Sequence, residues 1–187
     1  MRKTLGMALV ALISMMGASL IASAQNENPM VGGAAMYKTK DIVDNAVNSA
    51  DHTTLVAAVK AAGLVPTLKG KGPFTVFAPT NAAFDKLPGG TVDMLLKPEN
   101  KAMLTKILTY HVVAGNYDGK KLMGLIKKGG GAARLKTVSG GTLTVTMNGM
   151  NGLTLTDEKG GTANVTVADV RQSNGVIQVV DAVLMPM

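Results

Sequence analysis

The segment GPFTVFAPTNAAF, residues 72–84, decides how this chain folds. Side chains alternate through residues 74–78 with the period of two that is typical of an extended strand. Pro79 lacks the backbone N–H that sheet pairing needs, while Thr80 and Asn81 are both favoured as helix N-caps. The segment therefore predicts a short strand that ends at Pro79 and turns directly into a helix. It contains no group suited to catalysis.

The first 24 residues have the three parts of an export signal. Arg2 and Lys3 supply a basic start, residues 5–21 are mostly apolar, and residues 22–24 read Ala-Ser-Ala, a cleavage site of the A-x-A type. We expect residues 1–24 to be removed, which leaves a periplasmic or secreted protein with no integral membrane segment. A flexible lead over residues 25–37 and one domain over residues 38–187 are expected to follow.

Composition and charge further restrict the kind of exported protein and the kind of partner that the chain can have. The chain has no cysteine, which excludes a lipid-modified cysteine anchor and requires a fold that is stable without disulfides. Residues 97–136 carry nine basic residues against only Glu99 and Asp118, a net charge of +7. Residues 25–96 balance to zero, and residues 137–187 carry −2. A basic zone on an otherwise neutral domain favours an acidic partner surface.

Hydrophobic spacing changes between the two halves of the chain. Helical repeats occupy residues 42–47 and 55–62, with Asp51 or Thr53 as the expected cap of the second helix, and a longer helix follows Pro98. Strict alternation then begins at residue 142 and predicts strands. Residues 176–184 are apolar at almost every position, so we expect a last strand that is buried on both faces. Helices followed by strands indicate an α+β domain.

Three landmarks resemble one family of extracellular domains, and they occur in the same order. They are TVFAPTNAAF at residues 75–84, LTYHVVAGNY at residues 108–117, and NGVIQVVDAVLMP at residues 174–186. From about Lys38 to Pro186 the chain is identified as a member of the fasciclin-like domain family.

The resemblance implies a fold, a role and a set of site residues. The fold is a compact β-sandwich or wedge with helices packed along one side. The role is non-enzymatic, in adhesion at the cell surface or in the extracellular matrix. In animal members, segments around a Tyr-His pair and around an Asp-containing strand have been linked to receptor binding. The matching positions here are Tyr110, His111, Asp169 and Val170.

Residues with catalytic or metal-binding chemistry are few. His111 lies on the apolar face of its expected helix, so we interpret it as a buried structural group, and His52 has no second ligand nearby. Asp181 falls on an apolar strand face, where we interpret it as a structural hydrogen-bond acceptor. Neither a serine elbow nor a phosphate-binding loop occurs. We therefore predict no enzyme, no cofactor and no metal site, with Cu(I) capture by methionines as a minor alternative.

A basic helix face is the candidate binding surface. With about 100° between successive residues, four lysines fall in one sector of a helix that begins at Asp118, opposite its apolar residues. A triple glycine follows, and we expect it to form a mobile loop that leads to one further cation. The predicted surface is Lys120, Lys121, Lys127, Lys128 and Arg134. Its expected partner is an acidic polysaccharide, an envelope component or a protein at the cell surface.

Other partners are expected to be absent or secondary. Aromatic residues make up only 3% of the chain, which offers little stacking surface for nucleic acid. The alternative function is a carrier of a small apolar ligand, a lipid or a pigment, since some members of the family that it resembles bind such ligands. We expect a monomer in either case.

Overall fold

The computed structural model describes residues 28–149 and 152–187, so the expected export signal lies outside the described residues. The helices there are α1 Ile42–Ala46, η1 Ala50–His52, α2 Thr53–Ala62, α3 Val65–Leu68, α4 Asn81–Asp85, α5 Thr91–Leu95, η2 Pro98–Asn100, α6 Lys101–Tyr110 and α7 Gly119–Lys128, where η marks a 3₁₀-helix. The strands are β1 Met30–Val31, β2 Ala34–Ala35, β3 Phe74–Pro79, β4 Val112–Ala114, β5 Ala132–Lys136, β6 Thr142–Asn148, β7 Gly152–Thr156, β8 Thr162–Gln172 and β9 Gly175–Val180.

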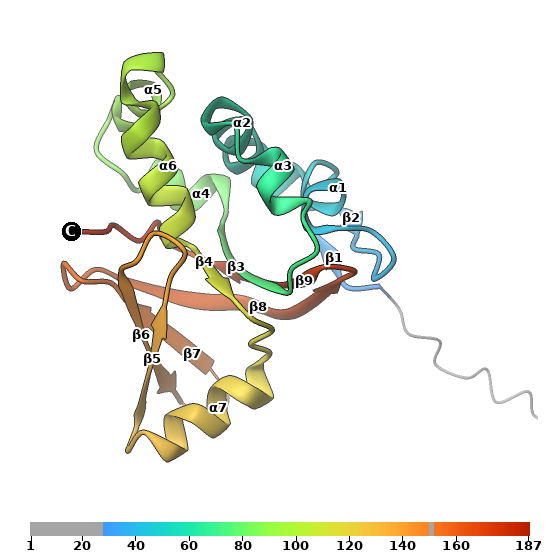
Figure 1. Ribbon diagram of the computed structural model, residues 1–187, viewed down its shortest axis with the longest axis vertical. Coiled ribbons are helices and arrows are strands. Elements are labelled where there is room, and N and C mark those ends of the chain that lie inside the picture. Colours follow the sequence, from blue (N-terminus) through green and yellow to red (C-terminus); the bar gives the residue numbers. More distant parts are fainter. Residues whose placement is uncertain (1–27, 150–151) are drawn as a thin grey trace, which may run out of the picture.

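The larger sheet is almost closed. Its strand order is β4-β3-β9-β8-β7-β6-β5, and β3 with β9 is its parallel pair. The two ends of the sheet approach each other, because Val113 of β4 forms a bridge with Thr137 and the N–H of Val138 donates to the carbonyl of Val112 at 2.8 Å. Helices α1–α6 lie along one side of this wedge, as expected, but α7 lies on the other side beside β5–β7 (Figure 1). The predicted α+β fold class is confirmed.

The central strands β3 and β9 are covered on both faces. Val76 and Ile177 belong to an apolar cluster with α1, α2 and α6, whereas Phe77 and Val180 belong to a second cluster with α7 and β5–β7. Figure 1 shows α1–α6 on one side of these strands and α7 with β5–β7 on the other. Such double burial explains why β9 is apolar at almost every position.

The segment that decides the fold performs two capping roles. Thr80 caps α4, since its hydroxyl accepts a hydrogen bond from the N–H of Ala83 at 3.3 Å. Asn81 instead reaches the start of α2, where its side-chain oxygen accepts from the N–H of Thr54 at 3.0 Å. We expected Asp51 or Thr53 to cap α2, and that was wrong because the capping oxygen comes from a residue distant in sequence.

Three expected boundaries differ from the structure. The lead over residues 25–37 was expected to be flexible, but its described part forms the β1–β2 hairpin, and Val31 and Met36 are buried. The last strand ends at Val180 rather than at residue 184. The triple glycine after α7 does form a loop, but strands were expected only from residue 142, whereas β5 already begins at Ala132, contains Arg134 and pairs with β6.

Candidate functional site

The lysine-rich helix α7 has one basic side and one buried side. Asp118 caps its first turn, where a carboxylate oxygen accepts from the N–H of Lys121 at 2.9 Å. Leu122 and Ile126 are buried against β5 and β6. The lysines of the helix are exposed, namely Lys120, Lys121, Lys127 and Lys128. The last two lie in the final turn, where positive charge is favourable beside the free backbone carbonyls.

The segment before α7 orients one of these lysines. The Thr75 hydroxyl of β3 accepts from the N–H of Tyr117 at 2.8 Å and donates to the carbonyl of Gly115 at 2.7 Å. Tyr117 in turn places its ring under Lys121, whose Nζ lies 4.5 Å from the ring centroid. A cation over an aromatic face is stabilised by the ring quadrupole. The basic face is therefore tied to the strand that begins the fold-deciding segment.

Arg134 lies on the opposite face of the sheet from α7. Its neighbours in β5, Ala133 and Leu135, are buried in the same cluster as the apolar face of α7. Because side chains alternate along a strand, Arg134 points the other way, beside Thr144 of β6. The five residues predicted as one surface are thus divided. The four lysines share α7, and Arg134 lies across the sheet from them.

Tyr110 and His111 are buried, and their polar atoms bond within the protein. The Tyr110 hydroxyl donates to the carbonyl of Thr142 at 2.8 Å and accepts from the N–H of Glu158 at 3.2 Å, and burial raises its pKa to about 12. His111 donates from Nδ1 to the carbonyl of Ile107 at 2.8 Å and accepts at Nε2 from the N–H of Leu184 at 3.0 Å. Burial lowers the pKa of His111 to about 4. Neither side chain is presented to a partner.

Asp169 occupies an irregular part of β8, close to the start of α7. Its backbone has a φ of 60°, a left-handed conformation that is uncommon for residues other than glycine. One carboxylate oxygen accepts from the N–H of Gly119 at 2.6 Å and from the side-chain amide of Gln178 at 2.9 Å. The structure thus uses Asp169 to join β8, β9 and α7, while the adjacent Val170 is fully buried.

Asp181 follows β9 directly and is half-buried. Its carboxylate accepts from the backbone N–H of Asn164 at 2.7 Å and from the side-chain amide of Asn164 at 3.1 Å. Partial burial acts to raise the pKa of Asp181, but the hydrogen bonds from Asn164 outweigh it and lower the pKa below its ordinary value. The second histidine, His52, is also buried, and its Nδ1 bonds with the Ser49 hydroxyl at 2.8 Å.

The described part of the chain has neither a metal-binding cluster nor a membrane-spanning helix. Within residues 28–149 and 152–187, no three histidine or acidic side chains gather closely enough to hold a metal ion. No helix in the same ranges has the length and apolar character needed to cross a bilayer.

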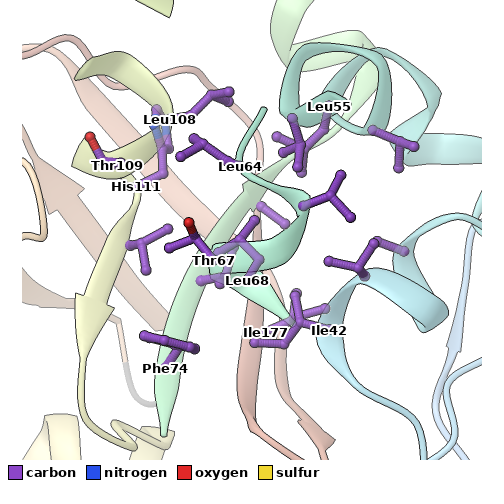
Figure 2. A pocket seen from close by; sticks show the side chains of 18 of the residues that line it. Ile42, Leu55, Leu64, Thr67, Leu68, Phe74, Leu108, Thr109, His111 and Ile177 are labelled. Atoms are coloured by element: carbon purple, nitrogen blue, oxygen red, sulfur yellow. The ribbon is translucent and has the colours of Figure 1, made fainter. Parts of the chain in front are cut away.

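An apolar cavity is the feature that sequence reasoning missed. It lies between α1, α2, α3, α6 and the strands β3 and β9, and it leaves about 70 Å³ of space to the centre of a water molecule (Figure 2). Its deep wall includes Leu55, Leu68 and Ile177, and its outer part includes the half-exposed Leu64 and Phe74. The one signal in the sequence is the apolar pair at residues 64–65, directly after the helix stop at residue 63.

Relatives of this chain include cell-surface proteins of bacteria. It is 42% identical over 183 residues to "Protein sll1483" of Synechocystis, an alignment that covers 97% of this chain and 89% of that protein. It is 36% identical over 166 residues to "Cell surface glycolipoprotein MPB83" of Mycobacterium bovis, covering 86% of this chain and 67% of that protein.

A solved structure and a family profile both point to the fasciclin domain. A domain pair from the insect cell adhesion molecule fasciclin I superposes with a TM-score of 0.70 at 18% identity, covering 78% of this chain and 51% of that chain. At that identity the superposition establishes the fold alone. The profile of the fasciclin domain matches residues 50–186. The chain therefore belongs to the fasciclin domain family.

Proposed function

We propose that this protein is exported and binds an anionic partner at the cell surface through the lysine face of α7. Fasciclin domains are non-catalytic, and this chain is not an enzyme. The relative MPB83 carries "cell surface" in its name, which supports an extracytoplasmic location. The observation that carries the proposal is the lysine face itself, namely Lys120, Lys121, Lys127 and Lys128, which are exposed on one helix.

Local charges leave these lysines available. Asp118, the acidic residue nearest to them in sequence, caps the helix through one oxygen and pairs with Arg171 through the other at 3.0 Å. None of the four lysine ammonium groups forms an ion pair with a carboxylate in the described parts of the chain. Clustered like charges without counterions raise the local concentration of a polyanion and accelerate its association. An acidic polysaccharide or an acidic envelope polymer fits this surface.

The test is retention of residues 25–187 on anionic and neutral polysaccharide columns across a salt gradient. The variant Lys120→Ser/Lys127→Ser/Lys128→Ser should elute from the anionic column at lower salt. Each exposed ion contact contributes about 0.2–1 kcal/mol, so affinity should fall between about threefold and hundredfold. Arg134→Ser is the matched control, because it removes one cation on the other face of the sheet. Equal retention of the triple variant and the wild type would overturn the proposal.

The cavity favours a second function, a carrier of a small apolar ligand. Binding sites for small molecules are concave and mostly apolar, as this space is. Protein expressed with its export signal and purified without detergent should then release a stoichiometric lipid or pigment on extraction with organic solvent. Extracts with no such compound, from a protein that also binds none when it is supplied, would reject the carrier function.

A further inference from the structure

Two polar side chains of the cavity wall, those of His111 and Thr109, already have hydrogen-bond partners within the protein. His111 is its deepest titratable residue, and both ring nitrogens are engaged by the backbone, at Ile107 and at Leu184. The hydroxyl of Thr109 likewise donates to the carbonyl of Thr105 at 2.7 Å. These groups present carbon edges to the space, so a hydrocarbon can fill it without leaving a polar atom unpaired.

One charged side chain stands at the edge of this cavity. Lys60 of α2 is exposed, and it is the charged residue among those that line the space. Its ammonium group has no ion pair or hydrogen bond with any described residue. A second ammonium, that of Lys101, lies beside Gly63 at the end of the same helix. The rim is therefore cationic at the point where the apolar wall ends.

We propose that the cavity binds a long-chain carboxylate, with its hydrocarbon chain between α2, α3 and α6 and its carboxylate at Lys60. This inference rests on the carrier function and names its ligand class. A lysine at the mouth of an apolar slot can pair with a carboxylate and remain hydrated, so the pair carries little desolvation cost. No acidic residue lines the cavity to compete for the ammonium.

The size of the cavity selects a slender ligand. A space of about 70 Å³ for the centre of a water molecule holds several water-sized spheres, at about 10–15 Å³ each. A flexible alkyl chain is only one methylene group wide and can bend to fit this space. A fused-ring ligand is wider and rigid, so it does not fit. Half-exposed apolar residues continue the contact outside the deepest part: Val56, Leu64, Val65 and Phe74.

A single tryptophan provides a site-specific reporter, because the natural chain has none. In a Leu64→Trp variant of the mature protein, palmitate should shift the emission to shorter wavelength with saturation at one ligand per chain. Lys60→Gln on this background should weaken palmitate binding roughly twofold to fivefold, as expected for one partly exposed ion pair. Hexadecanol has the same chain without the charge, so its affinity should not change on Lys60→Gln. Lys159→Gln, an exposed position between β7 and β8 and outside both proposed sites, serves as the matched control and should change neither affinity.

The possible outcomes separate the two levels of the proposal. Binding of palmitate and hexadecanol with equal affinity, unaffected by Lys60→Gln, would overturn the carboxylate assignment while leaving an apolar carrier. Failure of both ligands to bind, measured also by calorimetry on the unmodified protein, would overturn the carrier function and this inference together. Palmitate binding weakened as much in Lys159→Gln as in Lys60→Gln would show a general effect of charge and would overturn the carboxylate assignment to Lys60.

Discussion

Protonation of His111 removes the acceptor that holds the backbone of Leu184. The side chain is buried and neutral, with a pKa of about 4 against an ordinary value of 6.5. Between these values the unfolded chain binds a proton that the folded protein excludes, so the free energy of unfolding falls as pH decreases. The helical spacing of His111 favours its burial, but its bond to a residue 73 positions later is invisible in the sequence.

We expect the stability that depends on His111 to be complete above pH 6.5 and to be lost as pH falls toward 4. The loss corresponds to about 3 kcal/mol. Urea unfolding at pH 7.5, 5.5 and 4.5 measures it. The pKa of His52 is lowered by burial too, so the contribution of His111 is the difference between wild type and His111→Phe. Parallel pH profiles for these two proteins would contradict the assignment.

At the scale of elements, short segments owe their structure to partners elsewhere in the chain. The five residues of β5 follow three glycines and carry too short a pattern to predict a strand, yet pairing with β6 orders them. The α2 cap and the cavity depend likewise on contacts between separate elements. The long strands and helices were predictable, because each carries its own hydrophobic period.

The buried side chain of Asn174 links the β8–β9 turn to α1 and α3 through hydrogen bonds, and we call this link the clasp. Its side chain accepts from the N–H of Ile42 at 3.0 Å and donates to the carbonyls of Leu68 at 2.7 Å and Gly70 at 3.0 Å. Asn174→Ala should lower the free energy of unfolding by roughly 2–4 kcal/mol, because buried backbone groups lose their partners. Chemical denaturation of this variant and of the exposed control Asn116→Ala measures the difference, and equal stabilities would refute the clasp.

Across the whole molecule, the three landmarks of the family lie in adjacent strands. Residues 75–84 include most of β3, residues 108–117 include β4, and residues 174–186 include β9. These strands are central or covered, so packing constrains their side chains. Their sequence pattern therefore predicts the strands. The cavity is lined from several elements whose residues look like ordinary amphipathic stripes, which explains why sequence alone did not reveal it.

The C-terminal tail after β9 packs into the cluster of α7 and bonds to the turn between β7 and β8. Leu184 is fully buried in the cluster with α7, and the N–H of Met185 donates to Asp157 at 2.9 Å. Leu184→Ala should cost about 2–5 kcal/mol, which lowers the melting temperature by roughly 5–15 °C. Met187→Ala, at a position that is 74% exposed, should leave the melting temperature unchanged within error. Calorimetry of both variants decides whether the tail is part of the core.

The parallel pairing of β3 with β9 sets the moment at which the chain can fold. β9 lies between β3 and β8 in the sheet, yet in the chain it follows β3 only after β4 to β8. A nascent chain therefore exposes β3 without its partner until residue 180 has emerged from the ribosome. Such distant pairing delays folding, because a long loop must close before the contact forms. Until β9 has been made, a chain whose sheet cannot close remains able to thread through a narrow secretion pore.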